Sequence, residues 1–337
     1  MRYPDAEKYA IIRLVEQSSL SVKQTLTRLN IRKSTFYNWL KRLETGGVEG
    51  LADKKPSPGT PWNKLPGSEQ QSIVELALEK PELSPRELAV TYTDQRVRYV
   101  SESTVYRLLK THGLITSPAY ILMHAADKFS HPTTRVNEMW QTDFTYFKVM
   151  GWGWYYLSTI LDDYSRFIVA WRLCTTMSTK DVSDTLDDAL RLTNLDQLKV
   201  KHKPRLLSDN GPSYISGELA QYLKANDMTY TRGKPYHPQT QGKIERWHRS
   251  LKNRILLENY YLPGELENQI QQFIHYYNHE RYHEPLNNLT PGDVFYGRGN
   301  EILKQRQQIK VNTLLMRKQM HYHKRAQTLN PMSQTTP

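Results

Sequence analysis

The chain has 337 residues, with 46 Lys and Arg against 34 Asp and Glu, a formal charge of +12 and one cysteine. That length predicts two or three domains. A mean hydropathy of −0.70 and the lack of a long apolar run predict a soluble intracellular protein that does not enter a membrane. Because Cys174 is the one cysteine of the sequence, an internal disulfide and any zinc site built from several cysteines are excluded.

The positive charge is concentrated at the two ends of the chain. Residues 1–66 contain 12 basic and 6 acidic residues, residues 301–337 contain 7 and 1, and the remaining 27 basic and 27 acidic residues cancel. Because nucleic acids are polyanions, basic ends around a neutral middle predict a catalytic or folded core between parts that bind nucleic acid. The alternative is that both ends are merely solvated.

A spaced repeat predicts two similar helical modules in the first third of the chain. Residues 34–41 (Ser-Thr-Phe-Tyr-Asn-Trp-Leu-Lys) reappear as residues 103–110 (Ser-Thr-Val-Tyr-Arg-Leu-Leu-Lys). A Leu-Ser pair precedes each copy, so Ser21 and Ser84 are predicted to cap a shorter helix. Apolar residues at i, i+3 and i+4 predict the inward face of each second helix. The predicted outward faces carry Lys33, Tyr37, Asn38 and Lys41 in one copy, and Ser103, Arg107 and Lys110 in the other.

A short helix, a tight turn and a second helix with a basic outer face resemble the helix-turn-helix family, whose second helix enters the major groove of DNA. We expect such modules at residues 1–54 and 67–116, with linkers at 55–66 and 117–133. Proline and charge in the first linker predict an extended connection. The alternative is that the modules only provide packing.

From Trp140 onward, β-branched and aromatic residues with partial alternation predict strands. The pattern predicts three antiparallel strands, then a helix, a strand, a helix, a strand and a long helix. This order predicts an α/β fold with a mixed five-stranded sheet covered by helices. The expected ranges are 140–149, 154–161 and 166–173 for the first strands, then 179–192, 204–208, 215–226, 228–232 and about 240–259.

Three carboxylates are expected to meet at one edge of this sheet. Asp143 lies on the first strand, Asp209 ends the fourth strand and Glu245 begins the long helix. Converging carboxylates repel one another unless cations hold them, and two divalent ions can activate an attacking oxygen while stabilising the leaving one. Asp162 and Asp163 are alternative ligands because the hairpin returns them close to Asp143. Asp209, taken alone, is equally typical of a turn.

Three segments carry a resemblance to a known family: Trp-Gln-Thr-Asp-Phe-Thr at 140–145, Ser-Asp-Asn-Gly at 208–211, and Tyr-His-Pro-Gln-Thr-Gln-Gly-Lys-Ile-Glu-Arg at 236–246. Together they resemble the DDE transposases of bacterial insertion sequences and the retroviral integrases. The resemblance covers residues 134–260 and implies a ribonuclease-H-like catalytic core. Residues 289–295 are similar to the closing motif of such transposases. A single cysteine cannot supply the His-His-Cys-Cys zinc module of retroviral integrases, so the chain is more similar to the bacterial branch.

The resemblance implies a DNA transposase that binds the ends of its mobile element and catalyses metal-dependent strand cleavage and strand transfer. It implies Asp143, Asp209 and Glu245 as catalytic ligands of two Mg²⁺ ions, with Mn²⁺ as a substitute. The implied partners are double-stranded DNA, at element ends and target, and further copies of the chain in a dimer or larger assembly. The implied location is the bacterial cytoplasm, at the nucleoid. Further DNA contacts are expected from His237, Gln241, Lys243, Arg249 and Lys252.

Residues 261–337 are expected to form a helical basic region whose tail meets DNA phosphates. The cations of this tail are Lys304, Arg306, Lys310, Arg317, Lys318, Lys324 and Arg325. Two other functions stay open. One is a domesticated DNA-binding regulator with an inactive core. The other is a tyrosine recombinase, because residues 202–205 fit the short His-x-x-Arg fragment of that class.

Overall fold

The computed structural model describes residues 3–18, 20–52, 61–115, 133–196, 203–232 and 242–329. The chain divides into two compact units, Met1–Lys64 and Leu65–Pro337. In the described helices, none is both long enough and apolar enough to cross a membrane.

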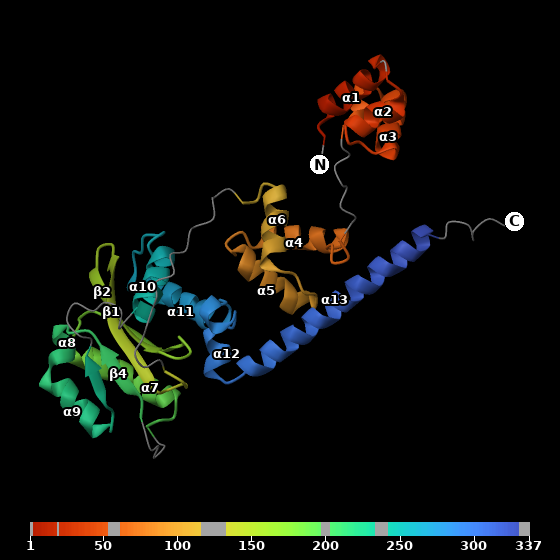
Figure 1. The fold of residues 1–337 in the computed structure, drawn as a ribbon. Coiled ribbons are helices and arrows are strands. Elements are labelled where there is room, and N and C mark those ends of the chain that lie inside the picture. The colour runs from red at the N-terminus through yellow and green to blue at the C-terminus, as the bar shows by residue number, and fades with distance from the viewer. Residues whose placement is uncertain are drawn as a thin grey trace. The chain divides into compact units, whose positions relative to one another are not determined.

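The first unit is a three-helix module (Figure 1). Helices α1 (Asp5–Gln17), α2 (Val22–Arg28) and α3 (Lys33–Gly46) are followed by the 3-10 helix η1 (Val48–Leu51). Ser21 is the N-cap of α2, and its backbone N–H donates to Gln24 Oε1 at 3.3 Å. Phe36 and Trp39 of α3 are buried in the core of the unit, as the periodicity predicted. The repeat gave no indication of α1.

The second unit begins with a module of the same kind. It consists of α4 (Gly67–Glu79), α5 (Pro85–Arg96) and α6 (Glu102–Thr111). Ser84 caps α5 by accepting the backbone N–H of Glu87, and the Glu87 carboxylate accepts the N–H of Ser84 in return. Val105 and Leu109 of α6 pack into the core of this module. Both repeat copies therefore form the predicted helix-turn-helix, each with one additional helix before it.

A five-stranded mixed sheet follows, as predicted (Figure 1). Its strands are β1 (Met139–Val149), β2 (Gly153–Asp162), β3 (Ile168–Cys174), β4 (Arg205–Ser208) and β5 (Tyr230–Arg232), in the order β3-β2-β1-β4-β5. Strands β1, β2 and β3 are antiparallel, whereas β4 is parallel to both β1 and β5. The short β4 leaves most of β1 without a partner on that side.

Helices cover both faces of the sheet. On one face, α7 (Thr179–Leu192) and α9 (Gly217–Ala225) pack on Trp140 and Ile160, with the short α8 (Pro212–Ile215) beside them. On the other face, α10 (Gly242–Ile255) and α11 (Pro263–His279) pack on Phe147 and Leu157. Successive residues of a strand point to opposite faces, which separates these two cores. Helix α11, beyond the predicted core limit at residue 260, shares the second core.

The C-terminal region is helical, as predicted. After the 3-10 helix η3 (Glu284–Leu286) come α12 (Pro291–Phe295) and the long α13 (Gly299–Leu329). Thr290 caps α12 by accepting the N–H of Asp293, and Phe295 stacks on Phe167 of the sheet module with ring centroids 4.4 Å apart. The closing motif thus attaches the C-terminal helices to the core.

Candidate active site

The strand register brings two of the predicted carboxylates level. Strand β4 pairs in parallel with β1, with Gln141 opposite Leu207. Asp143 lies two residues further along β1, and Asp209 directly follows β4, so the two residues lie at the same end of this pairing. The side chain of Asp143 is 22% exposed, and Asp209 is exposed in the loop directly after β4.

The loop after β4 restrains Asp209. The backbone N–H of Gly211 donates to Asp209 Oδ1 at 2.9 Å. A Cβ atom at position 211 would lie 3.0 Å from the same oxygen. Any residue other than glycine would therefore push the Asp209 carboxylate out of its present position. Partial loss of hydration raises the pKa of Asp209, the Gly211 N–H opposes this, and the negative charge of Asp143 raises it further. The two carboxylates therefore act on each other electrostatically.

Helix α10 brings the third predicted carboxylate to the same region. Glu245 lies in the first turn of α10 and is exposed. One turn later, His248 Nδ1 is 3.5 Å from Asp143 Oδ2, and the His248 side chain is largely buried. The backbone N–H of Ile244 donates to Gln141 Oε1 at 3.1 Å. The first turns of α10 thus lie against β1 next to Asp143.

Mg²⁺ prefers carboxylate oxygens as ligands. A bound cation would also neutralise the repulsion between the carboxylates of Asp143 and Asp209. These two carboxylates therefore fit a Mg²⁺ ion. Within the described ranges, no group of three or more His, Cys, Asp or Glu side chains is arranged to hold a metal ion. The structure brings Asp143 and Asp209 together and leaves Glu245 on the adjacent helix surface.

The alternative ligands Asp162 and Asp163 are engaged by protein donors. Asp162 is fully buried and accepts hydrogen bonds from the backbone N–H groups of Asn137 and Ser165, both at 2.8 Å. Burial raises the pKa of Asp162. It pairs with Trp140 in the sheet, three residues before Asp143. Asp163 is also buried, and its partners include Lys243. These contacts indicate a structural role for both carboxylates.

The predicted outward residues of the two recognition helices are all exposed. This set is Lys33, Tyr37, Asn38 and Lys41 on α3, and Ser103, Arg107 and Lys110 on α6. Lys33 Nζ lies 5.9 Å from the centroid of the Tyr37 ring, and Arg107 Nε donates to the Ser103 carbonyl at 3.0 Å. Their contacts with DNA stay predictions.

The residues expected to contact DNA around α10 have different environments. Arg249 is exposed. Lys252 Nζ lies 4.5 Å from the centroid of the exposed Tyr146 ring. Lys243 directs its ammonium group at Asp163, at 2.7 Å, so it has a protein partner where the sequence suggested phosphate. His237 and Gln241 lie outside the described residues.

Two cations of the C-terminal tail are not available to DNA in this structure. Arg306 donates to both carboxylate oxygens of Asp94 on α5, at 2.8 and 2.6 Å. Arg317 donates to Glu69 on α4 at 2.6 Å and is only 6% exposed. Each of these two cations therefore forms an ion pair with the second module, and the contact of the tail with DNA phosphates stays a prediction.

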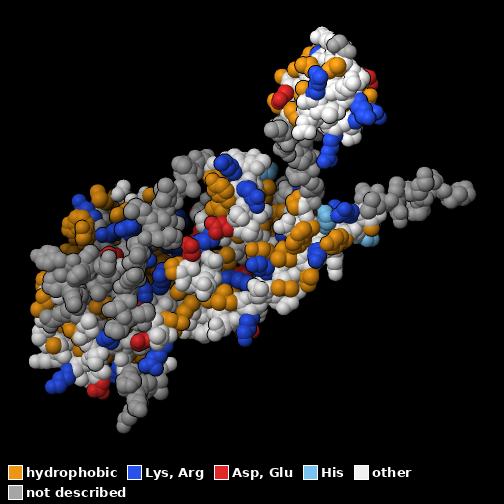
Figure 2. Space-filling model, viewed as in Figure 1, with side chains coloured by type: hydrophobic (Ala, Val, Ile, Leu, Met, Phe, Trp, Pro, Cys, Tyr) orange, Lys and Arg blue, Asp and Glu red, His pale blue; other side chains and the backbone are white. Residues whose placement is uncertain are grey.

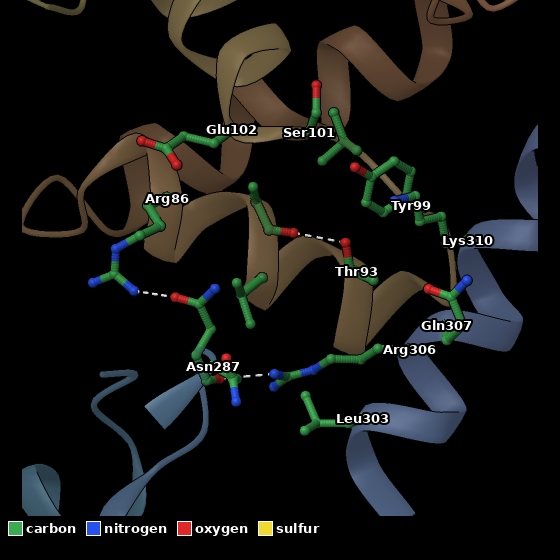
Figure 3. Close-up of a pocket in the computed structure, with 14 residues that line it drawn as sticks. Arg86, Thr93, Tyr99, Ser101, Glu102, Asn287, Leu303, Arg306, Gln307 and Lys310 are labelled. Atoms are coloured by element: carbon green, nitrogen blue, oxygen red, sulfur yellow. Dashed lines mark hydrogen bonds between the residues drawn. The ribbon is translucent and has the colours of Figure 1, made fainter. Parts of the chain in front are cut away.

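A cavity of about 320 Å³ lies between α13 and the second module (Figure 3). Arg306 and Lys310 line it from α13, and Arg86 lines it from α5. Helix α13 also carries exposed apolar side chains, among them Leu315 and Tyr322. Figure 2 shows basic and hydrophobic side chains together on the face in view. Helix α13 therefore serves as a docking surface for the second module as well as a basic tail.

Two residues near the site were not identified from the sequence in their present roles. The sequence indicated no role for His248 at the carboxylates, because its contact with Asp143 depends on how α10 packs on β1. Gln141 was part of a motif without an assigned role. Its position two residues before Asp143, on the same face of β1, is the signal that could have indicated it.

Models of known families match most of the described chain. The description "Integrase core domain" applies to two models, matching residues 133–238 and 226–291. The description "Homeodomain-like domain" applies to two others, matching residues 3–52 and 35–109.

Similar curated proteins come from bacteria and retroviruses. The putative transposase InsK for insertion sequence element IS150 of Escherichia coli (strain K12) is 25% identical over 269 residues, which cover 80% of this chain and 91% of that protein. The Gag-Pro-Pol polyprotein of Simian retrovirus SRV-1 is 32% identical over 119 residues, 35% of this chain and 6% of that protein. The chain covers only 12% of the mouse IgE-binding protein, which is 49% identical over 69 residues. It thus spans a small part of several relatives that it matches.

Among solved structures, the integrase catalytic core domain of HTLV-2, in complex with magnesium, has a TM-score of 0.38 and 21% identity over 48% of this chain and 97% of that one. The simian T-cell lymphotropic virus intasome has a TM-score of 0.40 and 19% identity over 66% of this chain and 74% of that one. The similarity to transposases and integrases depends instead on the integrase core and homeodomain-like matches and on the insertion-sequence relative. The chain is therefore similar to DDE transposases and integrases, with homeodomain-like helix-turn-helix modules ahead of an integrase core domain and a helical C-terminal region.

Proposed function

We propose that this protein is a DNA transposase that cleaves DNA at the ends of a mobile element and joins those ends to a target. The observation that supports this most directly is the parallel register of β1 and β4, which brings Asp143 level with Asp209 beside the first turns of α10. Two acidic side chains that influence each other's charge where β4 ends suit phosphoryl transfer better than they suit a purely structural core.

Asp143, Asp209 and Glu245 would hold two Mg²⁺ ions, or Mn²⁺ in their place. When bound, such ions promote attack on a phosphodiester and stabilise the departing oxygen. Gly211 restrains Asp209 through its backbone N–H, and His248 restricts the orientation of Asp143 from α10. The nucleophile is water in the first step and the DNA 3′-hydroxyl in the second, so no covalent protein–DNA intermediate forms.

The remaining parts of the chain bind DNA in this proposal. The outer faces of α3 and α6 contact the element ends, and Arg249 and Lys252 contact phosphates next to the reacting strand. At least two copies of the chain assemble on paired ends, so that cleavage waits until both ends are present. The protein acts at the bacterial nucleoid.

The test is a cleavage assay with purified full-length protein and labelled DNA carrying the terminal sequences of the element that encodes it. We expect cuts at the element ends and joined products in Mg²⁺, none in EDTA, and recovery on adding Mn²⁺. Specific end binding without cleavage under either metal would favour the inactive regulator. A DNA adduct on a tyrosine would favour the recombinase.

A further inference from the structure

We propose that Asp163, Lys243 and Gln141 form a positioning site that fixes helix α10 against strand β1. These are the elements that carry Glu245 and Asp143. The catalytic consequence of this site rests on the proposed function, whereas its structural consequence does not.

The centre of the site is the carboxylate of Asp163, directly after β2. Lys243 Nζ donates to Asp163 Oδ2 at 2.7 Å and to the Asp163 carbonyl at 2.8 Å. Gln141 Nε2 donates to Asp163 Oδ1 at 2.7 Å. Thr133 Oγ1 donates to Oδ2 as well, at 2.6 Å. The side chain of Asp163 is 3% exposed and that of Lys243 is 20% exposed, so water competes little for these bonds.

Gln141 connects this carboxylate to the helix. Its side-chain oxygen accepts the backbone N–H of Ile244 at 3.1 Å. Ile244 is the third residue of α10, and the first N–H groups of a helix have no partner within it. One amide group therefore joins Asp163 to the start of α10. Because Gln141 is two residues before Asp143 and Ile244 directly precedes Glu245, the site spans the two carboxylate-bearing elements.

Apolar packing alone does not define this arrangement. Ile244, Trp247 and Leu251 hold α10 on the sheet through contacts that are non-directional. Hydrogen bonds depend on distance and angle, so the bonds of Lys243 and Gln141 determine how far along β1 the helix begins. A reacting group that moves by 1 Å can slow catalysis by about a hundredfold. Asp163 and Lys243 thus act on the reaction through Glu245, without touching DNA.

The first measurement needs neither DNA nor metal. In the full-length protein, Lys243→Met keeps the side-chain stem but removes the ammonium group. We expect amide hydrogens in the first turn of α10 to exchange about tenfold faster, with peptides from α7 unchanged. Asp163→Asn should give the same local effect, and Lys243→Arg should restore protection. Lys243→Gln, which keeps one donor, provides an intermediate if the Met variant does not fold.

The second measurement is strand transfer at element ends. Lys243→Met and Asp163→Asn should each lower the rate by about tenfold to a hundredfold at unchanged DNA affinity, with partial rescue by Lys243→Arg. The rate losses of the two single variants should not add in the double variant, since both remove the ion pair between Lys243 and Asp163. The matched control is Lys180→Met, because Lys180 is 84% exposed beside Asp184 and should change neither exchange nor rate.

Two results would overturn the inference. In one, Lys243→Met exchanges and reacts like the parent. In the other, it loses DNA affinity in a salt-dependent way while exchange in α10 stays the same, which would make Lys243 a phosphate contact. If the parent protein cuts no DNA, the proposed function fails, and the exchange measurement still decides whether the positioning site exists.

Discussion

Gly211 shows how one residue without a side chain determines the place of a carboxylate. Its backbone φ of −61° is open to any residue, so conformational freedom is not the reason for glycine here. The reason is space, because an added Cβ would lie 3.0 Å from Asp209 Oδ1.

We therefore expect Gly211→Ala to displace Asp209 by a few tenths of an ångström and to slow DNA cleavage by about tenfold. Binding to element ends should not change. Gly217→Ala is the matched control, since a Cβ there meets no atom within 4 Å. Comparing the cleavage rates of the two variants tests the idea, and equal rates would show that Asp209 tolerates the displacement.

At the scale of single residues, the sequence predicted on which strand each aspartate lies but not which side chains bond across the fold. Local alternation predicted that Asp143 lies on the first strand, and the end of the apolar run predicted that Asp209 follows the fourth strand. The partners of Asp163 lie far away in the sequence, on β1 and α10. No local pattern encodes such a contact, so Asp163 was considered as a ligand, and its positioning role became visible only in the structure.

At the scale of elements, the sheet and most helices could be predicted because their apolar residues repeat at characteristic intervals. The helix expected at residues 215–226 forms as α9 (Gly217–Ala225), and the difference is the short α8 (Pro212–Ile215), which precedes it and was not expected. Ser216 takes an extended conformation and caps α9 by accepting the N–H of Leu219. A serine that bonds the backbone competes with helix continuation. Helices α1 and α4 were missed because the repeat covers only the two helices after them.

The exposed faces of α3 and α6 lead to a prediction about sequence recognition. Asn38 and Arg107 lie mid-helix, where side chains can reach base edges, whereas Lys41 and Lys110 come late, near backbone phosphates. Asn38→Ala and Arg107→Ala should each weaken discrimination at one or two base pairs by about 1 to 3 kcal/mol. Lys41→Ala and Lys110→Ala should weaken binding to specific and random DNA alike.

Selection of binding sites from random DNA, carried out for each of these four variants, provides the measurement. If Asn38→Ala and Arg107→Ala both select the parental sequence at undiminished strength, these helices do not contact bases.

Helix α13 allows a prediction that separates docking from DNA binding. Arg317 forms a buried ion pair with Glu69, and removing one partner of such a pair costs about 3 to 5 kcal/mol. Arg317→Ala should therefore loosen α13 from the second module and expose both to protease. Lys318→Ala should leave the contact intact, because Lys318 is exposed.

The companion measurement is the salt dependence of DNA binding. Lys318→Ala should lower the slope of affinity against salt by about 1 if this lysine meets a phosphate. If Arg317→Ala instead changes the salt slope of DNA binding and leaves the protease sensitivity as it is, Arg317 binds DNA and does not hold α13 on the second module.

At the scale of the whole molecule, the charge distribution corresponds to the division of the chain. The first module and the C-terminal tail are basic, and the core between them is close to neutral. On the face in view, Lys and Arg outnumber Asp and Glu (Figure 2). The structure adds that part of the tail's charge is neutralised internally, by Asp94 and Glu69. Composition could not indicate this, because ion pairing depends on which helices meet.

The central claim is that Asp143, Asp209 and Glu245 act together in cutting DNA. Its most direct test is the rate of cleavage at element ends in Mg²⁺ for the variants Asp143→Asn, Asp209→Asn and Glu245→Gln. DNA affinity is measured for each variant as well. The control is Glu218→Gln, because Glu218 is an exposed glutamate of α9. We predict at least a roughly hundredfold loss of rate for each of the three, with end binding retained and the control unchanged. Parental rates in the three variants would contradict the account.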